Sequence, residues 1–391
     1  MLALMTGAQI GGAVVQQGLG SLAPTFVATF SLSDAQLGLI FTALSLGSAV
    51  FTIGAGLVVD RVGERPVVLW GGIALGTTLC LAAAIPHYPW LCFWIFWFGV
   101  SYASQTPAGG RAILAWFDRG RGLAMSIRQA GVPLGGAIGS TILPVIAAHA
   151  NYRWSLFTGA LLGTGSAITA AIFYVDAPRA AGHAPRFRDI AKRMLVLARD
   201  PLTILFTVTC MVLSAGQGIT NGFFVLTAVH IVHLSPVAAG ATFAFAQVCA
   251  VFGRIIWGRL SDSVFHGDRA WPLVCIATIL ALAAYALPHV GPGNVGLLVL
   301  VGGALGISAA GWNGVFATAM AEIGGSELAG SVLGLGLTFI FLSLAAAPSL
   351  FGALADHTAL GTAWTVFGAI ATLGIIPPLL AVREGRARRN A

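Results

Sequence analysis

The chain has 391 residues, of which 57% are hydrophobic and only 8% are charged, and its mean hydropathy is +0.90. A soluble protein of this length would need about a quarter of charged residues to cover its surface. The composition therefore excludes a soluble domain and indicates that a lipid bilayer surrounds most of the chain. The net charge of +7 does not indicate nucleic acid, because the basic residues are not gathered with aromatic residues into a groove.

Apolar windows of about 20 residues predict membrane-spanning helices. The predicted fold class is accordingly an all-α membrane protein with twelve transmembrane helices. In chain order the predicted spans are residues 6–30, 36–58, 66–86, 91–116, 122–148, 155–175, 202–228, 236–259, 270–288, 295–319, 328–353 and 361–382.

Basic residues are distributed unequally between the two sides of the predicted bundle. Arg153 alone lies in a loop of one side, and Arg111, Arg128 and Arg254 lie inside predicted spans. By the positive-inside rule, this asymmetry predicts a multi-pass protein of the cell (inner) membrane with both termini cytoplasmic. The excess of Arg over Lys, with abundant Ala and Gly, indicates a bacterial source. The other 16 of the 20 Lys and Arg fall on the predicted cytoplasmic side: Arg61, Arg65, Arg119, Arg121, Arg179, Arg186, Arg188, Lys192, Arg193, Arg199, Arg259, Arg269, Arg383, Arg386, Arg388 and Arg389.

The longest polar stretch, residues 176–200, separates six predicted spans from six. Gly56 and Asp60 lie at the end of the second span, and Gly258 and Asp262 recur 202 residues later at the end of the eighth. A repeat at half the chain length predicts two pseudo-symmetric six-helix bundles, related by an axis along the membrane normal. The predicted divisions are an N-terminal bundle at 1–178, a cytoplasmic linker at 179–200 and a C-terminal bundle at 201–391.

The end of the second span reads Gly56-Leu-Val-Val-Asp60-Arg61-Val-Gly63-Glu64-Arg65. This resembles the signature loop of the major facilitator superfamily, Gly-x-Leu-x-Asp-Arg-x-Gly-Arg-Arg. Glycine permits close helix approach, and Asp60 is suited to satisfy the N-terminus of a neighbouring helix. Glu64 departs from the pattern, where the family has a basic residue, and predicts an altered local charge network. The resemblance implies a gating role for Gly56, Asp60, Arg61 and Arg65, and for Gly258 and Asp262 in the second half.

The start of the fifth span narrows the resemblance. Trp116-Phe117, Arg121 and Leu123-Ala124 precede the sequence Gly131-x-Pro133-x-Gly135. This stretch, residues 116–135, is similar to the monocarboxylate transporter and oxalate–formate antiporter branch of the superfamily. The resemblance implies a small anionic substrate and alternating access between two rigid bundles.

Arg254 is the clearest candidate for substrate binding, because an ionisable residue inside a membrane is costly and usually functional. It precedes Asp262 by eight residues, about 12 Å along a helix, which places it near the middle of a bilayer core of about 30 Å. A guanidinium stays charged and offers a bidentate fork to a carboxylate or nitrate. In the resembled carriers an arginine of the eighth span binds the substrate anion, and Arg254 matches that position. The alternative is a structural arginine bound to carbonyls at helix ends.

Further polar side chains accompany Arg254. Gln247 lies seven residues earlier on the same helical face. Arg128 is either a second cation for a dianion or a gate residue that pairs with cytoplasmic carbonyls, and Arg111 is expected to snorkel to the interface. Trp312 resembles an aromatic residue that encloses the substrate in the tenth span of the oxalate carrier. The predicted substrate-binding residues are Arg254, Arg128, Gln247, Gln129, Trp312, Asn313, Tyr102 and Gln17.

No Asp, Glu or His lies in the middle of a predicted span, although proton symporters usually carry such a residue as a relay. We therefore expect a monomeric secondary transporter of a small organic anion, with a monocarboxylate as the first candidate. It would act as an exchanger, or as a symporter whose substrate carries the proton. We expect no enzymatic activity, cofactor or metal. The alternatives are an inorganic anion such as nitrate or cyanate, and export of apolar or cationic drugs, which favours a membrane carboxylate that the spans lack.

Overall fold

The computed structural model describes residues 1–117, 121–175 and 199–390, with the side chains of residues 52–57, 60, 114, 121–123, 325–331 and 386–390 left outside the description. Throughout these residues the chain forms helices and turns, and none of them belongs to a β-strand. Ten of the described helical segments are long and apolar enough to cross a membrane. The fold class predicted from the sequence is confirmed.

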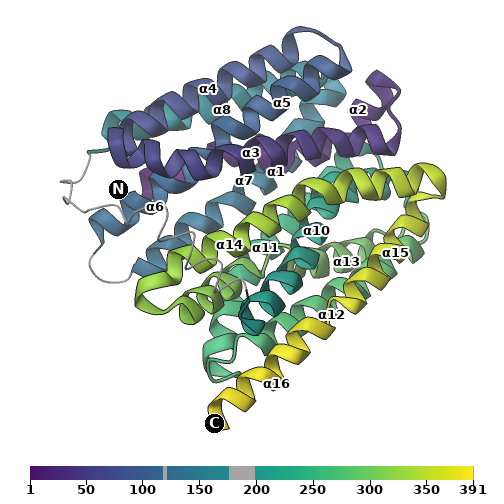
Figure 1. Cartoon of the computed structure of the whole chain (residues 1–391). Coiled ribbons are helices and arrows are strands. Elements are labelled where there is room, and N and C mark those ends of the chain that lie inside the picture. The colour runs from purple at the N-terminus through teal and green to yellow at the C-terminus, as the bar shows by residue number, and fades with distance from the viewer. Residues whose placement is uncertain (118–120, 176–198, 391) are drawn as a thin grey trace.

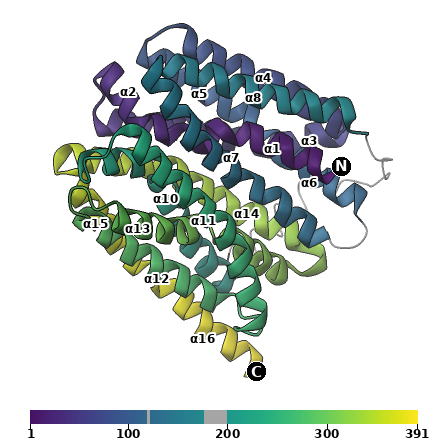
Figure 2. The same ribbon diagram turned by 180° about the vertical axis from the view of Figure 1, so that it is seen from behind.

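The helices form two bundles, which lie one above the other in Figure 1 and are seen from behind in Figure 2. The first bundle contains α1 (Leu2–Gly18), η1 (Leu19–Leu22), α2 (Ala23–Phe30), α3 (Asp34–Val62), α4 (Glu64–Ala84), α5 (Tyr88–Ala103), α6 (Gln105–Trp116), α7 (Arg121–His149) and α8 (Tyr152–Phe173). The second contains α10 (Pro201–His230), α11 (Pro236–Ser263), α12 (Ala270–Ala286), η2 (Leu287–His289), α13 (Val295–Ala309), α14 (Asn313–His357), α15 (Leu360–Leu373) and α16 (Ile376–Asn390).

Several helices begin where the chain supplies a side-chain cap. The Ser33 hydroxyl accepts a hydrogen bond from the backbone of Gln36, whose side chain accepts one in return, and this capping box starts α3. Asp200 and Ser235 cap α10 and α11, each followed by a proline in the first turn. Proline is suited to that turn because its missing N–H would have no partner there. These starts are therefore encoded locally.

The first and fourth predicted spans are interrupted, which corrects the expectation of single helices at 6–30 and 91–116. Along the first span, α1 ends at Gly18 and a 3-10 turn leads to α2. Along the fourth, α5 ends at Ala103, and Pro107 has no N–H to donate to the carbonyl at that helix end. Neither of these two stretches is among the ten long apolar segments.

The tenth and eleventh predicted spans also differ from the structure. Helix α14 is 45 residues long and includes the predicted loop between residues 319 and 328. The sequence Met320-Ala-Glu-Ile in this stretch consists largely of good helix formers, and no proline interrupts it. The stretch also contains Gly324-Gly325-Ser326, a composition typical of loops, yet the chain stays helical through it.

The packing of the helices repeats between the two halves. In the first half α1 packs on α7, α3 on α5 and α4 on α8, and the corresponding pairs in the second half are α10 with α14, α11 with α13 and α12 with α15. Between the halves, α3 packs on α14 and α7 packs on α11. A two-fold relation exchanges these last two pairs, so the repeat expected from the sequence is present in the packing. The division at residues 179–200 remains a prediction, because most of that segment lies outside the described residues.

Candidate functional site

We call the end of the molecule where α3 and α11 finish the basic end, and the end where they begin the far end. Arg254 lies on α11, at the seam between the halves. Its Nε donates to the carbonyl of Ala310 at 3.1 Å, and its Nη1 donates to the carbonyl of Gln129 at 2.9 Å. The second bond crosses from the second half to α7 of the first half.

Both carbonyls that bind Arg254 lack a partner of their own in a helix. The carbonyl of Gln129 would normally accept from the residue four positions later, but that residue is Pro133, which has no N–H. Ala310 is the C-cap of α13, where the last carbonyls of a helix are unpaired and carry partial negative charge. The structure thus places a fixed cation against two carbonyl dipoles, which is the arrangement expected for the alternative of a structural arginine.

Arg128 lies in the first half and is almost completely buried, with 1% of its surface exposed. Its Nη2 donates to Gln9 Oε1 at 2.7 Å and to the carbonyls of Gln105 and Thr106 at 2.9 and 3.3 Å. Gln9 in turn donates to the Tyr102 hydroxyl at 2.8 Å. Arg128 is therefore engaged by α1 and α6 of its own half, in the manner expected of a residue that holds carbonyls.

Neither arginine has a carboxylate partner among the acidic side chains that the structure describes. Those that form ion pairs do so elsewhere: Glu64 with Arg111, and both Asp262 and Glu322 with Arg269. Two guanidinium groups without a described carboxylate partner therefore lie within the bundle, with Arg128 buried and Arg254 partly exposed. Such a region attracts anions.

Amide side chains of both halves meet on the far-end side of Arg254. Asn221 Nδ2 on α10 donates to Gln17 Oε1 on α1 at 2.7 Å, which bridges the halves. Gln247 of α11 reaches toward α7 at Gly136, where an added Cβ would lie 2.8 Å from Gln247 Nε2 and equally close to Gln17. Only glycine leaves room for this approach.

Two small cavities border the amide side chains. One, of about 30 Å³, lies among residues that include Gln16, Gln17 and Asn221. The other, of about 10 Å³, is lined in part by Asn221, Gln247 and Ala310. Since a cavity of roughly 10–15 Å³ is needed for one water, the smaller cavity has room for about one water and the larger for about two, and the seam at these two places is closed to an organic solute.

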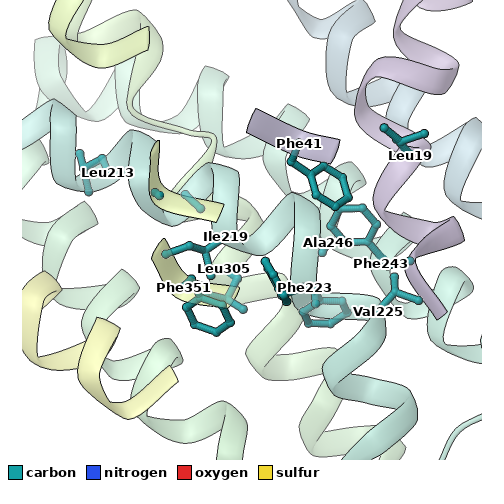
Figure 3. Close-up of a cluster of buried hydrophobic side chains, with 14 of the residues drawn as sticks. Leu19, Phe41, Leu213, Ile219, Phe223, Val225, Phe243, Ala246, Leu305 and Phe351 are labelled. Atoms are coloured by element: carbon teal, nitrogen blue, oxygen red, sulfur yellow. The ribbon is translucent and has the colours of Figure 1, made fainter. Parts of the chain in front are cut away.

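An apolar cluster closes the seam between the amides and the far end. Leu19 and Phe41 of the first half face Phe223 and Phe243 of the second half in this cluster (Figure 3). Phe41 packs directly on α10, since an added Cβ at Gly222 would lie 3.0 Å from its ring. The polar site therefore lies on the basic-end side of this apolar cluster.

Two further predicted site residues, Trp312 and Asn313, lie at the end of α13. Trp312 is buried and donates from Nε1 to the carbonyl of Ala309 at 2.9 Å, and Asn313 donates to the carbonyl of Ala310 at 3.2 Å. Asn313 thus shares an acceptor with Arg254. The Gln129 side chain approaches the other arginine, with its Oε1 3.4 Å from Arg128 Nη1.

Gln9 lies beside Arg128 but is not among the residues predicted from the sequence. The available signal was spacing: Gln9 precedes Gln16 by seven residues, which places both amides on one face of α1. Three glutamines on the first span could therefore have indicated a polar face.

The gating residues predicted from the signature loop lie at the basic end. Gly56 and the Asp60 side chain lie outside the described residues, and Arg61 is exposed. Arg65 donates to the carbonyl of Ala171 at 2.6 Å. The matching stretch of the second half lies in the last turns of α11, where no atom lies within 4 Å of a Cβ added at Gly258 and Asp262 pairs with Arg269 at 2.5 Å.

The expectation that Arg111 snorkels to the interface is wrong, because its side chain is held by partners inside the first half. Its Nε lies 3.0 Å from Glu64 Oε1, and its Nη1 donates to the carbonyl of Val59 at 2.6 Å. Glu64 is the residue that departs from the family signature, and its side chain is only 4% exposed. The altered charge network predicted at this position is therefore an ion pair between α4 and α6.

Comparison with solved structures shows a similar fold. A bacterial homologue of the human lysosomal transporter Spinster, in an inward-facing and unoccupied conformation, superposes with a TM-score of 0.82 over 98% of this chain and 96% of that chain. The sequence identity is 15%, so the similarity concerns the fold alone.

Two partial relatives have names that point to different cargoes. The 3-(3-hydroxy-phenyl)propionate transporter of Escherichia coli is 31% identical over 156 residues, which cover 39% of this chain and 36% of that protein. The fujikurins efflux protein of Gibberella fujikuroi is 24% identical over 334 residues, which cover 82% of this chain and 67% of that protein. These names do not agree on a substrate.

Membership of a family is shown over most of the chain. Residues 5–348 match the model of the Major Facilitator Superfamily. An uncharacterised transporter of this type from Mycobacterium tuberculosis, Rv2994, is 30% identical over 363 residues, which cover 90% of this chain and 79% of that protein. The chain is therefore a membrane transporter that belongs to the major facilitator superfamily.

Proposed function

We propose that this transporter carries a small organic anion, with a monocarboxylate as the first candidate, and that Arg254 binds the anionic group. The observation that carries the proposal is the guanidinium of Arg254 at the seam of the two halves, bonded to backbone carbonyls with no described carboxylate beside it. A carboxylate is a stronger acceptor for a guanidinium than a neutral carbonyl. An anion that reaches Arg254 therefore displaces the weaker bonds.

The same contact supports a mechanism of exchange. In the empty carrier Arg254 joins α11 to the Gln129 carbonyl of α7, so it holds the two halves together along one seam. A bound anion takes over the donors and releases that bond, so that the loaded carrier is freed to reorient. Alternating access then proceeds with substrate bound and stalls without it. A symporter whose substrate carries the proton fits the same geometry.

The charge at the seam also favours an anion over the cargo of a drug exporter. A cationic compound would be repelled by Arg128 and Arg254, and burying these charges beside an apolar compound would bring no compensation. The Escherichia coli relative is named for an aromatic carboxylate, which supports an organic anion as the cargo. The predicted topology, with both termini cytoplasmic, would place the basic end toward the cytoplasm.

Replacing Arg254 by Gln tests the proposal, because Gln keeps a donor but removes the charge. Loss of a charge-assisted bond worth about 1.5–3 kcal/mol should weaken anion binding by at least about tenfold. Arg254→Lys should also bind poorly, since an ammonium lacks the bidentate fork. Affinity and melting temperature are measured on one preparation by calorimetry and thermal unfolding, against a panel of mono- and dicarboxylates, nitrate and cyanate.

Arg153 provides a matched control. It also donates to two backbone carbonyls, those of Ala83 and Ala84 at 2.6 and 2.8 Å, but it lies at the far end, outside the seam. Arg153→Gln should lower the melting temperature and leave affinity unchanged. If Arg254→Gln behaves in the same way as Arg153→Gln, with normal affinity and reduced stability, the anion site is wrong and Arg254 is structural.

A further inference from the structure

The amides beside Arg254 contain polar atoms that no protein group satisfies. Thr220 Oγ1 and Gln247 Nε2 are buried without a hydrogen-bond partner in the described protein, and both residues are more than nine-tenths buried. Both line the smaller cavity. A buried donor or acceptor without a partner costs free energy, so these atoms point to a ligand group that hydrogen-bonds there.

The residues that bridge the two halves also line these cavities. Gln217 and Asn221 border both of them, and Gln17, the partner of Asn221, borders the larger one. The buried side-chain oxygen Oε1 of Gln16, at the larger cavity, likewise has no described partner. Donors and acceptors therefore surround a closed space that lies between the first helices of the two halves.

No charged side chain lines either cavity. The second cation of this region, Arg128, is held by Gln9 and by carbonyls of α6, and Gln9 lies about two helical turns along α1 from Gln16. A ligand group among the amides would therefore meet hydrogen-bonding partners without a counter-charge. An uncharged hydroxyl or carbonyl fits this chemistry, whereas a second carboxylate would be desolvated without compensation.

The distance between the amide side chains and Arg254 can be derived from α11, because Gln247 and Arg254 both lie on this helix. Gln247 precedes Arg254 by seven residues, which is two helical turns and about 10 Å along the axis. The two side chains lie on one face and lean in the same direction. Between them Ala250 is fully buried, and Leu305 and Gly306 of α13 face the same cavity, so the intervening wall is apolar.

We infer that the substrate is an organic anion with two different ends: an anionic group bound by Arg254 and an uncharged hydroxyl or carbonyl group bound by the amides of Gln17, Asn221 and Gln247, with an apolar spacer of about 10 Å between them. This inference rests on the proposed anion site at Arg254. The uncharged end of the substrate competes with the hydrogen bond between Gln17 and Asn221. It therefore loosens this link between the halves, in addition to the link through Arg254.

Three acids of equal chain length test the inference on the purified full-length protein. In 8-hydroxyoctanoate the carboxylate and hydroxyl are about 10 Å apart when extended, which matches two helical turns; octanoate lacks the hydroxyl, and octanedioate carries a second charge. Dissociation constants are measured by calorimetry, with Arg254→Gln as the blank for non-specific partition. We expect 8-hydroxyoctanoate to bind about tenfold more tightly than octanoate, as for the loss of one buried hydrogen bond, and more tightly than octanedioate.

Two variants assign the preference to the amide subsite. Thr220→Val keeps the side-chain shape and removes a hydroxyl that has no described partner, so it should not reduce the melting temperature. Asn221→Leu removes the bridging amide. Both should reduce the ratio of the octanoate dissociation constant to that of 8-hydroxyoctanoate toward one. Thr220→Val should do so without a change in affinity for octanoate, whereas Asn221→Leu also breaks the bridge and is judged by the ratio alone. The double substitution Gln17→Asn with Asn221→Gln conserves the summed length of the bridge and should restore the preference.

The outcomes separate this inference from the proposed function. If octanoate and 8-hydroxyoctanoate bind equally and both depend on Arg254, the polar subsite is wrong and the anion site stands. Tighter binding of octanedioate would contradict the uncharged end. If only acids shorter than octanoate bind in an Arg254-dependent way, the spacer is wrong. If no anion of any length depends on Arg254, both proposals fail.

Discussion

Asp356 caps the N-terminus of α3 from the other half of the molecule: its Oδ1 accepts from the backbone N–H of Asp34 at 2.7 Å, and its Oδ2 accepts from that of Ala35 at 3.0 Å. Asp356 lies in the last turn of α14, so the two helices meet antiparallel at the far end. A carboxylate at a helix N-terminus satisfies free N–H groups and interacts favourably with the helix dipole. This contact holds the far end of the seam together.

Removing that cap should open the far end. Asp356→Ala loses both hydrogen bonds, at a cost of about 0.5–2 kcal/mol, which converts to a shift of about two- to thirtyfold in the open population. Spin labels on exposed loops of the two halves, at His87→Cys and Gly291→Cys in a cysteine-free background, would report longer distances by pulsed EPR. Asn151→Ala, which removes the cap of α8 within the first half, is the control and should leave that distance unchanged. Equal distance distributions for Asp356→Ala and the parent would show that the cap has no part in closure.

Pro133 leaves the Gln129 carbonyl free for Arg254, so Pro133→Ala should weaken the seam. The new N–H of residue 133 would bond the carbonyl within α7 and compete with the guanidinium. We expect net uptake of anion into empty proteoliposomes to rise several-fold relative to exchange, because the empty carrier is less firmly held. In the parent, counterflow of labelled anion should occur without a pH gradient.

Pro144 in the same helix is the matched control for Pro133. It frees a different carbonyl, that of Ser140, with which Arg254 forms no bond. Pro144→Ala should therefore leave the ratio of net uptake to exchange unchanged. A parent protein that requires an imposed proton gradient, with no stimulation by internal anion, would contradict exchange.

Gly109 and Gly110 are adjacent glycines with different surroundings. A Cβ at Gly109 would lie 2.0 Å from Arg128 Nε, whereas a Cβ at Gly110 would come no closer than 3.8 Å to any side chain, that of Met125. Gly109→Ala should displace Arg128 and cost about 1–3 kcal/mol of stability. Gly110→Ala should stabilise α6 by up to about 1 kcal/mol. Thermal unfolding of the two variants compares them directly, and equal melting temperatures would contradict the close packing of Arg128 on α6.

The predicted topology is tested by thiol labelling of intact cells. Arg188→Cys, in the predicted cytoplasmic linker, should not react with a membrane-impermeant reagent added outside. Gly291→Cys, in an exposed loop at the far end, should react readily. Labelling in the reverse pattern would place the termini outside.

The sequence by itself determined the class of this protein, the twelve spans and the repeat. Each rests on a local or periodic signal: apolar runs long enough to cross a bilayer, and Gly-x-x-x-Asp at matching helix ends. It also identified Arg254, because one charge among apolar residues stands out in a single helix. Even the interruption of the fourth span has a local cause in Pro107, although the twelve-span prediction did not use it.

Only the tertiary structure decided how the polar residues are used. Arg254 bonds a carbonyl on α7, Arg111 pairs with Glu64, and Arg128 is engaged by Gln9. These partners lie on different helices, so the contacts depend on how each helix is rotated and where it crosses its neighbours. Helices that are apolar on all sides carry little information about that rotation, because lipid and protein interior are almost equally apolar surroundings. The rotation of each helix is set by the packing of the helices within and between the two halves.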